Sequence, residues 1–369
     1  MRILRLAGGP GVGKSTVAWE VARRLGDEGT PTGYVDIDQL GMCYPAPGGD
    51  PDRWHLKERV LQHIARAHEA VGVDLLVVSG VAETRTPPPS HGYPATSIWL
   101  DAEESVRRAR LAARGWDDGQ VGRALQAGTT ESTHAHTDWI RLATDRLAAG
   151  AVADAVIDRV GSQPGSAAGA ATRALRPVST AAGRVVWLTG PRLAGASTVG
   201  WRLVSERWSA GLVTGFADAA QLAFTANVDD HDHDHGLALA GVAALHEAFA
   251  EVQAHEFVVV APQVITPDAV RLTFPHAEVV IVRLGADEPT RRTRAGERRA
   301  ARGPRLAGDD VAEATDAEIA ALIVDGAVEP REDPGVVVVE TSGLELRAAV
   351  DTVRRALGGD MSSVGDPAP

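Results

Sequence analysis

Cysteine and lysine are almost absent from this chain of 369 residues. The one cysteine, Cys43, excludes an internal disulfide framework and a zinc site built from cysteines. Lysine and arginine together number 37, of which only Lys14 and Lys57 are lysines, so the other 35 are arginines. Because the chain uses arginine almost everywhere, the two positions where it keeps a compact ammonium group are informative.

Long apolar segments and excess positive charge are also missing. No apolar run approaches the length of a membrane span, and residues 1–6 are too short for a signal peptide, so we expect a cytoplasmic protein with no membrane partner. The net charge of -12 makes nucleic acid an unlikely partner, because such binding depends on neutralising phosphates. A small anionic ligand in a locally positive site remains compatible with this charge. The apolar content of 44% and the length predict a globular protein of two domains.

The sequence GGPGVGKST at residues 8–16 matches the phosphate-binding pattern G-x-x-x-x-G-K-[ST] without a mismatch. The apolar run at 3–7 predicts a buried strand before it, and 17–25 predicts an amphipathic helix after it. An incidental glycine-rich turn would need neither neighbour, so we interpret this stretch as a nucleotide-binding loop. Its candidate binding residues are Gly8, Gly9, Pro10, Gly11, Val12, Gly13, Lys14, Ser15 and Thr16.

Each part of such a loop has a physical task. The glycines let backbone N–H groups approach a phosphate closely, and the helix N-terminus adds partial positive charge there. Lys14 would bridge the β- and γ-phosphates of ATP, which makes it a candidate catalytic residue. The Ser15 hydroxyl would hold Mg²⁺.

A second, altered version of this stretch lies 182 positions later, with Gly190 in the place of Gly8. The same offset aligns Gly33-Tyr34-Val35-Asp36 with Gly215-Phe216-Ala217-Asp218, and the apolar run 75–78 with 257–260. It also aligns 156–158 with 338–340, and with a slip of two it aligns the arginine-rich 104–114 with 288–298. We infer a tandem duplication.

The repeat predicts an α/β protein of two tandem P-loop NTPase domains, each a parallel sheet of about five strands flanked by helices. We expect a first domain at 1–160, a flexible linker rich in Gly, Ala, Ser and Pro at 161–182, a degenerate second domain at 183–358, and a disordered tail at 359–369. The strands expected in the first copy are 3–7, 33–37, 75–79, 97–100 and 155–158.

The first copy resembles the P-loop kinases of small molecules and nucleotides, the group around shikimate, gluconate and nucleoside monophosphate kinases. The resemblance rests on the phosphate loop, on 34–39, on Val77-Val78-Ser79-Gly80 and on 99–115. It covers about residues 1–160, and more weakly 183–358.

Two aspartates follow the second expected strand, Asp36 and Asp38. Residues two apart on an extended chain point to the same side, and ligands bind at the carboxyl ends of parallel strands. The resemblance implies that Asp36 belongs to the Mg²⁺ shell and that Asp38 is a catalytic residue that orients or deprotonates the acceptor. The alternative is that both aspartates only cap a turn.

The second copy keeps Asp218 in the place of Asp36 but has Ala196 for Lys14 and Ala220 for Asp38. Loss of these two groups with the scaffold retained predicts a domain that no longer catalyses.

Arg107, Arg110 and Arg114 share one helix face, and the resemblance implies that such arginines clamp the moving phosphoryl group. We take Arg110 and Arg114 as catalytic candidates, with a solvated helix face as the alternative. The chain has no Walker B aspartate at the end of its third expected strand. Ser79 and Gly80 occupy that place, and we expect them to contact the substrate.

Two further features favour plain interpretations. Lys57 could contact an anion near the acceptor, but a surface position is the preferred interpretation. The His/Asp run at 229–235 has metal-binding chemistry without a fixed geometry, so a solvated loop is preferred.

These residues predict a kinase that uses ATP and Mg²⁺ to phosphorylate a small-molecule acceptor, with the first copy active. The alternative is a nucleotide-binding regulatory or interaction protein without an acceptor, for which the Asp36/Asp38 pair would be unnecessary.

Overall fold

The computed structural model describes residues 1–161, 175–228, 232–300, 308–312, 314–325 and 333–358. Most of the expected linker, the expected tail and residues 229–231 of the His/Asp run lie outside these residues. The rest of that run, 232–235, is not a loop but the first turn of helix α7 (Asp232–Glu251). No helix among the described residues is long and apolar enough to span a membrane.

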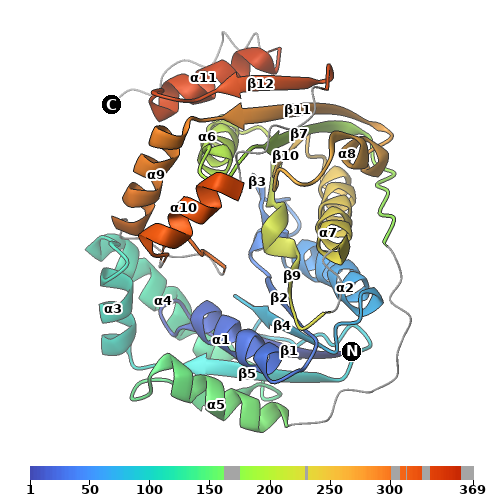
Figure 1. Cartoon of the computed structure of the whole chain (residues 1–369). Helices are drawn as coiled ribbons and strands as arrows, with labels where there is room; N and C mark the ends of the chain where they lie inside the picture. Colours follow the sequence, from blue (N-terminus) through green and yellow to red (C-terminus); the bar gives the residue numbers. More distant parts are fainter. Residues whose placement is uncertain (162–174, 229–231, 301–307, 313, 326–332, 359–369) are drawn as a thin grey trace.

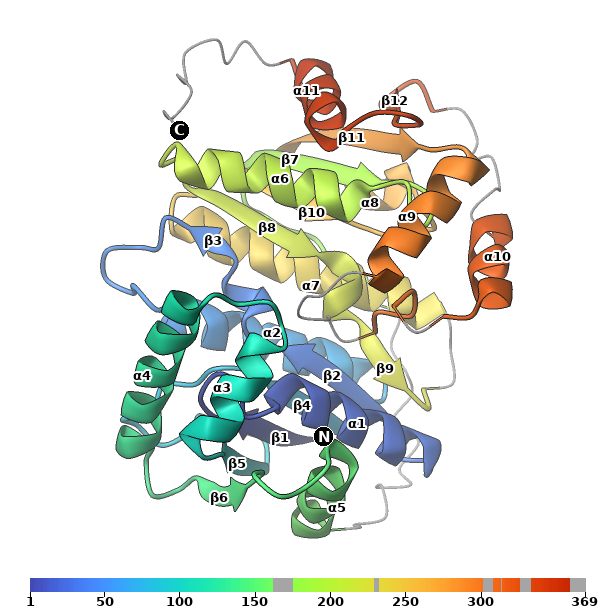
Figure 2. The same ribbon diagram turned by 90° about the vertical axis from the view of Figure 1, so that its left-hand side faces the viewer.

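Two six-stranded sheets organise the molecule, one per copy, and each is parallel except at one edge (Figures 1 and 2). The first sheet has the order β6-β5-β1-β4-β2-β9 and the second has the order β12-β11-β7-β10-β8-β3. In the first sheet the strands are β1 (Arg2–Ala7), β2 (Thr32–Asp36), β4 (Leu75–Ser79), β5 (Ala95–Asp101), β6 (Ile140–Ala143) and β9 (Phe224–Ala226). In the second they are β3 (Cys43–Tyr44), β7 (Gly183–Thr189), β8 (Thr214–Asp218), β10 (Glu256–Val260), β11 (Ala277–Gly285) and β12 (Val336–Glu340).

The edge strands are exchanged between the copies. β3 comes from the first copy but pairs antiparallel with β8, with Cys43 opposite Gly215. β9 comes from the second copy and pairs antiparallel with β2, with Thr225 opposite Gly33. Figure 2 shows β3, drawn in blue, beside β8 of the second sheet, and β9, drawn in yellow, beside β2 of the first. Each sheet therefore has five strands of its own, as predicted, and a sixth that the sequence did not indicate.

Helices cover both faces of each sheet, as the predicted fold class requires. In the first copy they are α1 (Lys14–Asp27), α2 (Trp54–Ala70), α3 (Glu104–Ala112), α4 (Asp118–His134) and α5 (Ala149–Val160). In the second they are α6 (Ala196–Ser209), α7, α8 (Pro267–Thr273), α9 (Glu288–Ala300), α10 (Asp316–Asp325) and α11 (Leu346–Ala356).

Alternation along the strands sends side chains into two cores per copy. In β1, Leu4 and Leu6 pack under α1 and α5, whereas Ile3 joins a core that also contains Trp187 and Phe257 of the second copy. That shared core lies between the sheets and is filled by α2 and α7, which lie next to each other in Figure 1. Because both inner faces contribute to one core, the two copies pack as a pseudo-symmetric pair.

The fifth expected strand, at 155–158, is wrong. These residues belong to α5, where Val152, Ala153 and Val156 are buried at helical spacing. The fifth strand is β6, a four-residue edge strand with only Leu142 buried, so it left almost no hydrophobic pattern in the sequence. The alignment of 156–158 with the strand residues 338–340 fails for the same reason.

Candidate functional site

The loop at 8–16 lies where β1 ends and α1 begins. Gly8, Gly11 and Gly13 have φ values of 148°, 84° and 99°, which residues other than glycine rarely adopt. A Cβ on Gly8 would lie 2.2 Å from the Leu100 carbonyl oxygen, and one on Gly9 would lie 2.9 Å from the Cα of Gly128 in α4. The loop glycines are therefore required both for the backbone conformation and for the packing of α4 against the loop.

Lys14 is the first residue of α1 and folds back over the loop, donating a hydrogen bond from Nζ to the Gly9 carbonyl oxygen at 3.2 Å. Burial lowers the pKa of Lys14, while the nearby carboxylates of Asp38, Glu131 and Asp36 act in the opposite direction. Arg114 lies close enough to lower it further. An ammonium group surrounded by three acids is well placed to neutralise an incoming phosphate.

The structure brings together Ser15 and Asp36, the two residues expected to hold Mg²⁺. The Ser15 hydroxyl donates to Asp36 Oδ2 at 3.2 Å, and Asp36 Oδ1 accepts from the Asp38 backbone N–H at 2.9 Å. Burial, and next the charge of Asp38, raise the pKa of Asp36 to about 6. A hydroxyl and a carboxylate oxygen side by side fit the hard-oxygen preference of Mg²⁺. No group of three or more His, Cys, Asp or Glu side chains that could hold a metal is found in the described part of the chain, so waters and phosphate oxygens would complete the shell of a bound Mg²⁺.

Gly80 joins this cluster and Ser79 does not. A Cβ on Gly80 would lie 3.1 Å from Asp36 Oδ1 and 3.3 Å from Asp38 Oδ2, so this glycine keeps space open beside both carboxylates. Ser79 is 1% exposed, and its hydroxyl lies 2.9 Å from the Tyr34 hydroxyl inside the sheet. The expected substrate contact by Ser79 therefore does not agree with the structure, because its position on β4 points it into the core.

Lys57 is buried rather than on the surface, which corrects the preferred interpretation. Its Nζ lies 2.9 Å from Asp38 Oδ1 and 4.5 Å from the centre of the Trp54 ring. Its side chain is 4% exposed, whereas that of Asp38 is 43% exposed. The stem packs on Gly41, where a Cβ would lie 2.6 Å from Lys57 Cε. Both lysines of the chain therefore lie next to Asp38. Lys57 holds the Asp38 carboxylate from the buried side, and the other side of this carboxylate is exposed.

Arg110 does not face a phosphate site. Its guanidinium donates to the carbonyl oxygens of Gly11 (3.4 Å) and Val12 (3.1 Å), and to Thr144 at both its hydroxyl (3.2 Å) and its carbonyl (3.1 Å). These bonds fasten the loop to α3 and to the segment after β6. The catalytic role expected for Arg110 is therefore replaced by one of holding the loop.

Arg114 remains the arginine that can respond to a ligand. It lines a cavity of about 410 Å³ together with Gly13, Thr16 and Arg110. Its side chain has no hydrogen bond or ion pair among the described residues, and it acts on the pKa of Lys14. Its place beside the loop keeps it a candidate for contacting the phosphates.

Sequence reasoning placed Arg107 on the arginine face without choosing it as a catalytic candidate, and it missed Glu131. Arg107 is 3% exposed and donates to the Pro10 carbonyl at 3.0 Å and to the Leu125 carbonyl at 3.2 Å, which ties the loop to α4. Glu131 of α4 lies near Lys14 and Asp38, and burial raises its pKa. Nothing in the local sequence around Glu131 marks it, because it reaches the site only through the docking of α4.

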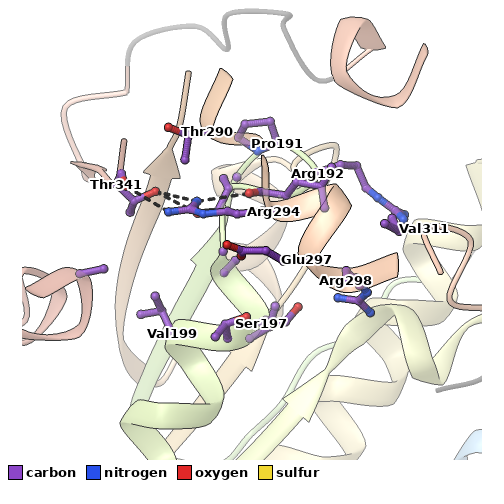
Figure 3. Close-up of a pocket in the computed structure, with 18 of the residues that line it drawn as sticks. Pro191, Arg192, Ser197, Val199, Thr290, Arg294, Glu297, Arg298, Val311 and Thr341 are labelled. Carbon is purple, nitrogen blue, oxygen red and sulfur yellow. Dashed lines mark hydrogen bonds between the residues drawn. The ribbon is translucent and has the colours of Figure 1, made fainter. Parts of the chain in front are cut away.

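The second copy repeats the backbone of the loop without its lysine. Gly190, Leu193 and Gly195 have φ values of 155°, 69° and 97°, close to those of Gly8, Gly11 and Gly13. Arg294 repeats the bonds of Arg110, donating to the carbonyl oxygens of Leu193 (3.2 Å) and Ala194 (2.8 Å) and to Thr341 (Figure 3). The backbone scaffold therefore survives where Lys14 has become Ala196.

Comparison of the helices extends the list of lost groups. At the ends of α2 and α7, Gly72 corresponds to Gln253, because both donate to the carbonyl three residues earlier. The offset is therefore 181 here rather than 182, which places Ala238 at the position of Lys57. It also makes Ala261 the counterpart of Gly80, whereas an offset of 182 would give Pro262. The N–H of Gly80 donates to the carbonyl of Leu6 in β1, and the N–H of Ala261 donates to the carbonyl of Leu188 in the matching strand β7.

Comparison with solved structures finds matches that cover about half of this chain. No family model matches the chain, and no curated protein matches its sequence. An unliganded sugar kinase from Janibacter sp. HTCC2649 is 14% identical, over 50% of this chain and 99% of that one, with a TM-score of 0.35. A gluconokinase from Sinorhizobium meliloti 1021 is 16% identical, over 48% of this chain and 95% of that one, with a TM-score of 0.30. An uncharacterized protein from Eubacterium ventriosum ATCC 27560 is 12% identical, over 47% and 98%, with a TM-score of 0.28. Each of these alignments covers about half of this chain, and at these TM-scores and identities none of them assigns an activity to it.

Proposed function

We propose that the first copy is a phosphotransferase that moves the γ-phosphoryl group of ATP to a hydroxyl group of a small molecule. One observation carries this proposal. Lys14, Asp36 and Asp38 lie together around one loop, and each has a role available to it in phosphoryl transfer. A protein that only binds a nucleotide has no need of an exposed carboxylate held in place by a buried lysine.

The loop amides and Lys14 would hold the β- and γ-phosphates. Mg²⁺ held by Ser15, Asp36 and the phosphates would neutralise charge that develops on the transferred group. The cavity beside Arg114 and Thr16 lies on the outer side of the loop, where it would take the ribose and base. The acceptor would then approach from the side of Asp38 and Gly80.

Transfer requires one bond to form and one to break. The acceptor oxygen bonds to the γ-phosphorus while the bond from that phosphorus to the β–γ bridging oxygen breaks, so ADP leaves. Asp38 accepts the proton of the acceptor hydroxyl, and Lys57 behind it fixes the position of the carboxylate. Positioning and charge neutralisation supply most of the rate enhancement in such a reaction.

The test is an acceptor panel with the full chain and Mg·ATP. We expect ADP formation that depends on one class of hydroxyl compound, a phosphorylated product detectable by phosphorus NMR, and loss of both in Lys14→Ala. Saturable nucleotide binding with no acceptor-dependent turnover across sugars, polyols and nucleosides would favour the regulatory alternative. Full turnover in Lys14→Ala would refute the site assignment.

A further inference from the structure

The second copy contains a cavity of about 1060 Å³, larger than that beside the first loop. Its walls are the loop at 190–197, the face of α9 that carries Thr290, Arg294 and Glu297, and the segment 341–349 (Figure 3). This volume is sufficient for a ligand of nucleotide size. A domain kept only as scaffold has no need for such an opening.

One part of this cavity corresponds, position by position, to the 410 Å³ cavity of the first copy. Thr198, Val199 and Arg298 replace Thr16, Val17 and Arg114, and Thr341 replaces Thr144. The main changes are Glu297 for Ala113, Glu345 for Ala148 and Leu346 for Ala149. The space that we assign to ribose and base in the first copy is therefore present in the second, next to a loop of the same backbone conformation.

The charges differ. Arg298 donates to Asp309 at 3.1 Å, and Arg192 is paired with Asp310, so two arginines of this cavity already have carboxylate partners. The lysine is absent, while Asp218 remains and burial raises its pKa. Glu297 adds a further acid to the wall. A triphosphate would meet this acidic wall without an ammonium group to offset its charge.

We propose that the second copy is a nucleotide site that binds a nucleoside monophosphate and carries out no transfer. One phosphate would accept from the loop amides at the start of α6, and the nucleoside would occupy the space between Thr198, Val199 and the segment 341–349. This inference rests on the nucleotide class of the proposed function but not on phosphoryl transfer by the first copy.

A matched pair of substitutions separates the two loops. Thr16 and Thr198 are equivalent, both are exposed, and both lie in the first turn of the helix that follows the loop. A carboxylate at that place is favourable for a helix, so both Thr16→Glu and Thr198→Glu are expected to fold, which circular dichroism would check. In each case the new charge repels a phosphate at that loop only.

The experiment is a calorimetric titration of AMP into the full-length chain in EDTA. We expect Thr16→Glu to retain one binding event and Thr198→Glu to weaken that event at least about tenfold, which is the effect of about 1.4 kcal/mol. Binding abolished by Thr16→Glu and kept in Thr198→Glu would overturn the proposal. So would the absence of any AMP binding at millimolar concentration, or binding that neither substitution changes. Failure of the acceptor panel with Mg·ATP would leave this titration unaffected, so the two proposals can fail separately.

Discussion

The two copies have the same backbone around their loops, but the second has lost three charged side chains of the first. Lys14, Asp38 and Lys57 of the first copy are alanines in the second, at 196, 220 and 238. Lys57 is 3% exposed and its ammonium is paired with Asp38, so either residue alone would leave a partly buried charge without its partner. The comparison teaches that these residues form one unit, which is kept or lost as a whole.

The arginines show the opposite behaviour, since the second copy keeps them. Arg107 and Arg291 are both buried and both donate to a carbonyl of a following helix, Leu125 and Ile323 respectively. Arg294 likewise repeats the bonds of Arg110. Arg107 and Arg110, whose bonds are repeated in a copy without Lys14, therefore serve the fold, whereas Asp38 and Lys57, which are lost with Lys14, are assigned to the chemistry.

The largest effect is expected when the lysine is moved from the first copy to the second, which tests the division between residues of the fold and residues of the chemistry. Lys14→Ala is expected to lower kcat/KM by about 10³-fold, because the phosphate charge loses its ammonium partner. Adding Ala196→Lys to that variant should restore nothing, since Ala220 and Ala238 leave the second copy without an acceptor carboxylate. Initial rates with the accepted substrate would measure both. Recovery of activity by the transplanted lysine would contradict the idea of a three-residue unit.

A smaller effect comes from the exchanged strands. Phe224 belongs to the second copy, but the centre of its ring lies 4.9 Å from the ring centre of Trp19 and 6.0 Å from that of Tyr34, both in the first copy. Phe224→Ala should lower the free energy of unfolding by about 2 kcal/mol through lost packing, because this ring is only partly buried. Urea denaturation followed by tryptophan fluorescence and circular dichroism would measure it.

The control is Met42→Ala at the matching position of the first copy, which packs against the core of the second. Because one core contains residues of both sheets, each variant should unfold in a single transition seen by both probes. Two separate transitions, with Phe224→Ala shifting only one, would show that the copies fold independently and would refute the shared core.

The sequence predicted the features that depend on local pattern. The loop, its flanking strand and helix, four of the five strands expected in the first copy and the duplication all follow from residue spacing. The exchanged strands could not be predicted, because Cys43–Tyr44 and Phe224–Ala226 are too short for a periodic signal and pair only with residues of the other copy.

The site shows the same limit. Asp36, Asp38 and Gly80 follow the ends of the neighbouring parallel strands β2 and β4, and Ser15 lies at the start of α1, which follows the central strand β1, so the four residues come together. Lys57 and Glu131 reach the site from helices α2 and α4, whose docking no local motif describes. Arg110 was misjudged because a helical face indicates direction but not which backbone carbonyls lie opposite.

The finest test concerns Lys57 as a positioning residue in the first copy. Lys57→Met keeps a long apolar stem over Trp54 and against Gly41 but removes the ammonium that holds Asp38. We expect kcat to fall about tenfold with KM nearly unchanged, because the carboxylate loses its position and not its charge. Stability should change by no more than about 1 kcal/mol, since the half-exposed Asp38 can turn to water. In an Asp38→Ala background, Lys57→Met should lower kcat no further, because the group it positions is gone. An equal loss in both backgrounds would show that Lys57 contacts the acceptor directly.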